Sequence, residues 1–268
     1  MIRGLLGAAA VVLCAAGVWL CRVGADALAL ASCRDIFSSV DVKSCQRTSV
    51  DALGLRFEKR MVGTSAQIRI FTRSGMMVQT VSAAIEGSSE SGVMLLRDLD
   101  GDGRDELLLS LDTGSAHPNS HWALWRATGD STQFREVRAP DLNDDVMHVV
   151  GALFGSDFWR VGDGLVAEYG TGPTRSWLTR IYRFEGNQLV PIVSVENDGI
   201  RLDGSMSPCQ LEKVYDLARI GLAAGEARDR FCASTEERQR RQIARFYILR
   251  LEGVRYHHPA WDPGGCAS

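Results

Sequence analysis

The segment from Asp98 to Leu109 constrains the fold of this chain more than any other part of the sequence. It reads Asp-Leu-Asp-Gly-Asp-Gly-Arg-Asp-Glu-Leu-Leu-Leu, so acidic residues alternate with small or apolar ones before an apolar run begins. A hard cation such as calcium takes six to eight oxygen ligands at about 2.3–2.6 Å, and a tight acidic loop can supply them. Because the leucines follow the loop immediately, the segment predicts an ion-binding loop between two β-strands.

The expected ligands are carboxylates at alternate positions and one backbone carbonyl. The predicted metal site consists of Asp98, Asp100, Asp102, the carbonyl of Arg104, and Glu106. Five carboxylates within the nine residues from Asp98 to Glu106 would repel one another without a cation, which favours bound Ca²⁺ over an ordinary polar turn. We expect Asp105 to face solvent, or to replace Glu106 as a ligand. The loop is not an ordinary EF-hand, because Leu109 stands where a bidentate glutamate would be required.

From about Leu53 to Asp203 the sequence has the pattern of an all-β fold. Apolar and polar residues alternate, and Gly, Asn and Asp clusters mark the turns between runs. The expected strands are Gln67–Thr72, Met76–Ile85, Gly92–Arg97, Leu107–Leu111, His121–Arg126, Leu165–Tyr169, Trp177–Phe184 and Leu189–Val195. The pattern therefore predicts a mainly β protein, an antiparallel β-sandwich or meander with one calcium loop.

The last quarter of the chain indicates a C-terminal helical segment. Apolar residues recur with helical spacing from Pro208 to Leu222, which predicts an amphipathic helix. A capping box at Ser234–Glu237 predicts a second helix that begins near Thr235. Arginines in that helix could form a basic patch, but a solvated helix face is the favoured interpretation. These arginines are Arg238, Arg240, Arg241 and Arg245.

The N-terminus has the features of an export signal. Arg3 precedes an uninterrupted apolar run of 18 residues from Gly4 to Cys21. The segment could be cleaved after a small residue, kept as a membrane anchor, or processed as a lipoprotein signal with Cys33 lipidated. Each alternative places the folded part outside the cytoplasm, so we expect a periplasmic protein attached to the membrane by its N-terminus. We divide the chain into residues 1–32 (signal or anchor), 33–204 (calcium-binding β domain) and 205–268 (helical segment).

The cysteines are consistent with an oxidising compartment. The local pairs would be Cys33 with Cys45 and Cys209 with Cys232, and Cys266 would be left over. If Cys33 carries a lipid, Cys45 needs a distant partner, and the cysteine count alone does not decide the connectivity. No cysteine spacing suggests zinc, so structural disulfides are favoured.

Other motifs give little support for catalysis or for nucleic-acid binding. The net charge of −3 does not favour a nucleic-acid partner. His117 and His121 are four residues apart, but Pro118 lies between them and argues against a helical zinc site. Asp141–Asp145 repeats half of the acidic spacing without its glycine, and an ordinary turn is favoured there. Gly170–Trp177 lacks the ending of a phosphate loop and is expected to be an exposed hairpin. We find no nucleophile elbow or acid–base pair, so we expect the protein not to be an enzyme.

The acidic loop resembles the calcium loops of integrin-type FG-GAP repeats, although this chain has only one intact copy. A closer resemblance lies in the residues that follow it. They are Leu107–Leu109, Thr113–Gly114, Asn119, His121–Trp122, Trp125, Gly129–Phe134 and Trp177–Leu189. Over roughly residues 65–195 this order resembles the periplasmic β-fold family that includes immunity proteins against peptidoglycan hydrolases delivered by bacterial type IV secretion. That family shares a topology with inhibitors of invertebrate-type lysozyme.

The resemblance implies a calcium-bearing β-sandwich that binds and inhibits a muramidase or related hydrolase through loops inserted into the active cleft. The implied partner is a peptidoglycan hydrolase or another envelope protein. The C-terminal helical segment has no counterpart in that pattern. The alternatives are a calcium-stabilised adhesion or scaffold module without inhibitory activity, and an envelope enzyme whose site the sequence does not reveal.

Overall fold

The computed structural model of the 268-residue chain describes residues 30–33, 44–86, 92–112, 119–139, 151–172, 175–201 and 203–251, with side chains as far as Arg241. The chain divides into two units, Met1–Ala31 and Ser32–Ser268, and the second contains all the strands and helices discussed below. Within the described residues, no helix is both long and apolar enough to cross a membrane. The apolar run Gly4–Cys21 lies outside them, as do His117, Asp141–Asp145 and Cys266.

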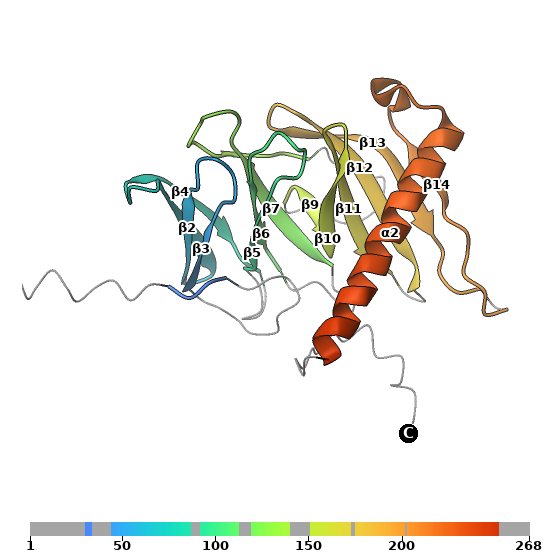
Figure 1. The fold of residues 1–268 in the computed structure, drawn as a ribbon, viewed down its shortest axis with the longest axis horizontal. Helices are drawn as coiled ribbons and strands as arrows, with labels where there is room; N and C mark the ends of the chain where they lie inside the picture. Colours follow the sequence, from blue (N-terminus) through green and yellow to red (C-terminus); the bar gives the residue numbers. More distant parts are fainter. Residues whose placement is uncertain are drawn as a thin grey trace, which may run out of the picture. The chain divides into compact units, whose positions relative to one another are not determined.

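Three antiparallel sheets follow one another along the chain (Figure 1). Sheet 1 contains β1 (Ser44–Thr48), β2 (Arg56–Val62), β3 (Ser65–Phe71) and β4 (Met77–Ala84), paired in that order. Sheet 2 contains β5 (Met94–Arg97), β6 (Glu106–Ser110), β7 (Ser120–Arg126) and β8 (Arg135–Glu136), with β9 (Leu153–Gly155) also paired to β7. Sheet 3 contains β10 (Asp157–Gly162), β11 (Leu165–Thr171), β12 (Trp177–Glu185), β13 (Gln188–Asn197) and β14 (Gln210–Val214). In sheets 1 and 3 each strand pairs with its sequence neighbours, so both are meanders, whereas in sheet 2 β9 passes β8 and pairs with β7.

Sheet 2 is the central layer, because its two faces contribute to two different hydrophobic cores. Leu107 and Leu109 pack with residues of sheet 1 such as Phe57. Leu108 lies on the opposite face and packs with Phe158 of sheet 3. Side chains alternate between the two faces of a strand, so a strand with both faces covered needs consecutive apolar residues. This explains the run of leucines after the acidic loop, all three of which are completely buried.

The helix α2 (Ala224–Leu251) covers the far face of sheet 3, next to β13 and β14 (Figure 1). Ala227 and Phe231 of α2 pack into a third core with sheet 3 residues such as Ala167 and Val193. Polar pairs also join the two layers, since the hydroxyl groups of Thr235 and Thr179 are hydrogen-bonded at 3.2 Å. The predicted fold class, mainly β with a C-terminal helical segment, is therefore confirmed, although three sheets are stacked.

The two predicted helix boundaries were wrong. Pro208–Leu222 does not form one helix, since β14 pairs with β13 there and the short 3₁₀ helix η2 (Leu217–Ile220) follows. The free edge of β13 offers backbone groups that a strand can satisfy, which local periodicity does not reveal. The helix α2 begins at Ala224, where Glu226 accepts a hydrogen bond from the Ala223 backbone N–H at 3.0 Å. Thr235 lies inside α2, and its hydroxyl donates to the Phe231 carbonyl at 2.9 Å.

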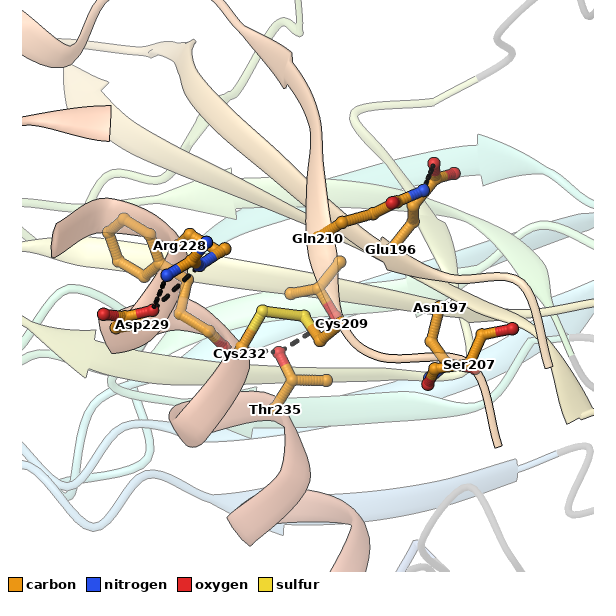
Figure 2. Close-up of a disulfide and its surroundings, with 11 residues drawn as sticks. Glu196, Asn197, Ser207, Cys209, Gln210, Arg228, Asp229, Cys232 and Thr235 are labelled. Atoms are coloured by element: carbon orange, nitrogen blue, oxygen red, sulfur yellow. Dashed lines mark hydrogen bonds and ion pairs between the residues drawn. A yellow bond between two sulfur atoms is a disulfide. The ribbon is translucent and has the colours of Figure 1, made fainter. Parts of the chain in front are cut away.

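Two disulfides join Cys33 to Cys45 and Cys209 to Cys232. These are the two local pairs considered from the sequence, and such bonds fit an exported protein. The first bond uses the same sulfur that a lipid on Cys33 would need, so lipidation is incompatible with it. The second bond connects the start of β14 to α2 and joins cysteines that are 23 positions apart in the sequence (Figure 2).

Replacing both Cys209 and Cys232 by alanine should lower the free energy of unfolding by about 2–4 kcal/mol, because the crosslink no longer restricts the unfolded chain. Hydrogen exchange should become faster in β14 and in the first half of α2, while sheet 1 should be unaffected. The measurement is denaturant unfolding combined with hydrogen–deuterium exchange. An unchanged unfolding midpoint would show that the bond adds no stability.

Asp157 connects sheet 2, sheet 3 and α2 through ion pairs of its buried carboxylate. Its carboxylate is completely buried at the start of β10. It accepts hydrogen bonds from Arg97 of sheet 2 at 2.9 Å and from Arg238 of α2 at 2.5 Å. Burial alone would raise the pKa of Asp157, but the hydrogen bonds and charges of Arg238 and Arg97 lower it below its ordinary value. Arg238 is therefore part of the packing between α2 and the sheets.

The substitution Asp157→Asn should cost about 3–5 kcal/mol of stability near neutral pH, because two guanidinium groups lose their common anion. The pKa of Asp157 is lowered by folding, so its contribution is present above the unfolded-state pKa of about 4 and is lost in more acidic solution. The difference between wild type and variant should thus shrink below about pH 4. Thermal unfolding from pH 2 to 7 measures this effect. The control Arg241→Gln, on the exposed face of α2, should melt like the wild type.

Candidate metal centre

The acidic loop connects β5 to β6 at the end of sheet 2, as its sequence predicts. The two strands pair antiparallel, and Arg97 lies opposite Glu106 at the mouth of the loop. Gly101 and Gly103 both have positive φ angles, of 83° and 85°. Glycine adopts this conformation without strain, and it lets the backbone turn sharply around the acidic side chains.

Three of the predicted ligands converge. Carboxylate oxygens of Asp98, Asp100 and Glu106 all lie within 4.8 Å of one another. Asp102 is not in this group; its Oδ1 accepts a hydrogen bond from the backbone N–H of Arg104 at 2.9 Å. Oxygens that share one calcium ion are separated by at most about twice the ligand distance of 2.3–2.6 Å. The spacing of these three carboxylates therefore fits such an ion.

Glu106 is the feature of the cluster that most clearly indicates a ligand. The residue is completely buried, and its Oε2 accepts a hydrogen bond from the backbone N–H of Leu99 at 2.7 Å. Its Oε1 has no hydrogen-bond partner among the described residues. Nε of Arg126 lies 3.5 Å from this oxygen and is likewise buried without a hydrogen bond to any described residue. A buried, unsatisfied carboxylate oxygen is costly, and a cation would remove that cost.

The electrostatics of the cluster lead to the same conclusion. The pKa of Glu106 is raised from 4.5 to about 8, mainly by burial; the charges of Asp100 and Asp102 contribute to the rise, while the Leu99 N–H and Arg126 oppose it. Burial also raises the pKa of Asp100, against the opposing charge of Arg126. Both groups thus lie in a site that disfavours their negative charge when no divalent ion balances it. The donor set consists only of oxygens, which suits calcium better than zinc.

Arg104 and Asp105 anchor the loop to the rest of the protein. The Arg104 guanidinium is buried, pairs with Asp51 at 3.0 Å and donates to the carbonyls of Gly129 and Ser131. The expectation that Asp105 faces solvent was wrong, since only 3% of it is exposed and its carboxylate accepts the Val50 N–H at 2.7 Å. Its partner is 55 residues away in the sequence, and so the local pattern does not reveal it. Asp51 was likewise missed, because an isolated Asp between strands carries no signal of this role.

The other candidates from the sequence do not form a second site among the described residues. His121 lies in β7, where its Nδ1 is bonded to Asp112 and its ring is 4.6 Å from that of Phe154. Gly170–Trp177 spans the connection between β11 and β12, which is a hairpin as expected. Arg240 and Arg241 pair with Glu237 on the solvent side of α2.

No protein-family model matches the chain, and no curated protein matches it. Among solved structures, the chain is similar to one described as a Xanthomonas type IV secretion system related protein, with 10% sequence identity and a TM-score of 0.40. The similarity covers 70% of this chain and 95% of that one.

The substitution Glu106→Gln tests the proposed ligand directly. Since folding raises the pKa of Glu106 to about 8, the ion-free wild type should lose stability as the pH rises from 4.5 towards 8. The variant should lack this loss, so in chelator at pH 8 it should melt at least as high as the wild type. Millimolar calcium should raise the melting temperature of the wild type but not that of the variant.

The matched control is Asp130→Asn, which removes an exposed carboxylate from the turn after β7. It should respond to calcium like the wild type. A wild type that melts at the same temperature in chelator and in calcium would contradict the metal assignment.

Proposed function

We propose that this chain is an exported, envelope-attached calcium-binding protein that binds and inhibits a peptidoglycan hydrolase. In this proposal the protein acts by binding and not by catalysis. Calcium is held by Asp98, Asp100 and Glu106, with Asp102 and the carbonyl of Arg104 completing the set predicted from the sequence. The hydrolase is recognised by surfaces other than the buried ion site.

One observation carries the calcium part of the proposal. The completely buried Glu106 has a carboxylate oxygen without a hydrogen-bond partner, and this side chain converges with two further carboxylates. A polar turn in solvent would leave these groups hydrated. Here burial removes water from Glu106, so a divalent cation is the partner that best balances the cluster.

The contacts of the loop favour a structural role for the ion. Asp105 and Arg104 tie the loop to the residues around Val50 and Asp51, just after β1, while Glu106 begins β6 of sheet 2. Arg160 of sheet 3 lies 3.6 Å from Asp98. An ion at this point would hold the three sheets together, and it would leave the exposed loops and strands for contact with a partner.

The inhibitory part rests on the resemblance of residues 65–195 to the periplasmic immunity-protein and lysozyme-inhibitor family. The two disulfides fit the compartment in which peptidoglycan hydrolases act. The adhesion or scaffold module remains the alternative, since it needs the same calcium-stabilised β fold.

The test is a cell-wall lysis assay with purified protein and a panel of peptidoglycan hydrolases that includes any hydrolase encoded beside its gene. We expect the protein to slow clearing of a cell-wall suspension by its cognate hydrolase at millimolar calcium. The double substitution Asp100→Ala and Asp102→Ala should weaken inhibition at 37 °C, because the fold loses its ion. The control Asp130→Asn should inhibit like the wild type.

Three other results would reject inhibition. Unaltered lysis across the whole panel would contradict it outright. Tight binding to an envelope protein without any effect on lysis would support the adhesion or scaffold alternative. Cleavage of cell-wall material by the protein alone would show that it is an enzyme.

A further inference from the structure

We propose that the positively charged side chain of Arg126 competes with the metal ion for the acidic loop and thereby lowers the ion affinity of the site. This inference rests on the calcium site proposed above. Arg126 is the last residue of β7, and about 10% of its side chain is exposed. It is not one of the residues that the loop motif itself identifies.

The guanidinium of Arg126 contacts three of the acidic groups expected to bind the ion. Its Nη2 donates hydrogen bonds to Asp100 and, at 3.0 Å, to Asp102. Its Nε faces Glu106 Oε1 at 3.5 Å. One positive charge therefore partly balances three carboxylates. These are the same carboxylates that would bind an incoming cation.

The same side chain has a second set of partners outside the loop. Its guanidinium carbon lies 4.6 Å from the centre of the Phe184 ring, and Nη1 donates to the Gly186 carbonyl at 3.3 Å. Phe184 belongs to β12, and Gly186 lies in the turn between β12 and β13. Arg126 can therefore release Asp100 and Asp102 and still keep a stacked ring and a carbonyl as partners.

The other arginines near the loop are not placed to compete in this way. Arg97, opposite Glu106, donates to Asp157 and to the Phe158 carbonyl. Arg160 is half-exposed, and the predicted ligand with which it pairs is Asp98, at 3.6 Å. Arg104 is bonded to Asp51 and to two backbone carbonyls. Among the described residues, Arg126 alone bridges several of the predicted ligands.

Competition follows from the charges involved. The attraction of Arg126 for the carboxylates stabilises the ion-free protein, and its repulsion of a divalent ion destabilises the ion-bound one. A unit charge about 5 Å from a divalent ion changes the affinity by about tenfold even at the dielectric constant of water. Removing the charge should therefore strengthen ion binding by about this factor or more.

The experiment is isothermal titration of calcium into the full chain, comparing the wild type with Arg126→Gln, Arg126→Lys and Arg240→Gln. Arg240→Gln removes the same charge from the exposed side of α2, and its affinity should equal that of the wild type. Arg126→Gln should bind calcium about tenfold more tightly, and in chelator it should melt at a lower temperature because the carboxylates lose their counterion. Arg126→Lys should stay close to the wild type, since it keeps the charge.

The outcomes separate this inference from the calcium site itself. Equal or weaker binding by Arg126→Gln would show that Arg126 supports the site instead of competing with the ion. Equally tight binding by Arg126→Lys and Arg126→Gln would show that charge is not the determinant. Either result overturns the inference and leaves the calcium site intact. If neither the wild type nor any folded variant binds calcium, the proposed calcium site is wrong. If Arg126→Gln does not fold in chelator, chelator is titrated into its calcium-loaded form, and the calcium affinity obtained in that way decides the inference.

Discussion

The buried negative charge of the acidic loop is the constraint on which the arrangement of the sheets depends. Glu106 has to be buried because it begins a strand with both faces covered, and it brings a carboxylate into the interior. Two other acidic residues of the loop contact the neighbouring sheets. Asp105 accepts a hydrogen bond from Val50 near sheet 1, and Asp98 lies near Arg160 of sheet 3. If this charge is not balanced, the point where all three sheets meet is destabilised.

A second buried carboxylate has the corresponding role between sheet 2, sheet 3 and α2. Asp157 is balanced inside the protein by Arg97 and Arg238, and its pKa falls. Among the described residues, the basic partner of Glu106 is Arg126, at 3.5 Å and without a hydrogen bond, and the pKa of Glu106 rises. Both carboxylates are completely buried, so the difference lies in their partners. This contrast is the physical reason to assign an external cation to Glu106 and none to Asp157.

The sequence predicted the parts of the fold that depend on local pattern. The strands of sheets 2 and 3 follow their alternating or continuous apolar runs, and the acidic loop has its expected place between two strands. It did not predict β14, which forms because β13 has an edge to pair with, or the burial of Asp105 by the distant Val50. Arg126 was missed for the same reason, since its relation to the loop arises only when β7 is paired beside β6. Contacts between residues far apart in sequence were thus beyond the reach of local patterns.

The burial of the loop also bears on where a partner can bind. Glu106 is inaccessible and Arg104 is almost so, which leaves them unable to contact another macromolecule directly. Calcium modules outside the cell bind their ion at about 10⁻⁴–10⁻³ M, and binding at such a site stabilises only the folded chain. Under the proposed function the ion-bound loop would therefore stabilise the stacked sheets where calcium is abundant. Recognition of a hydrolase would then depend on exposed side chains that the ion never touches, and loss of calcium would weaken it by loosening the fold.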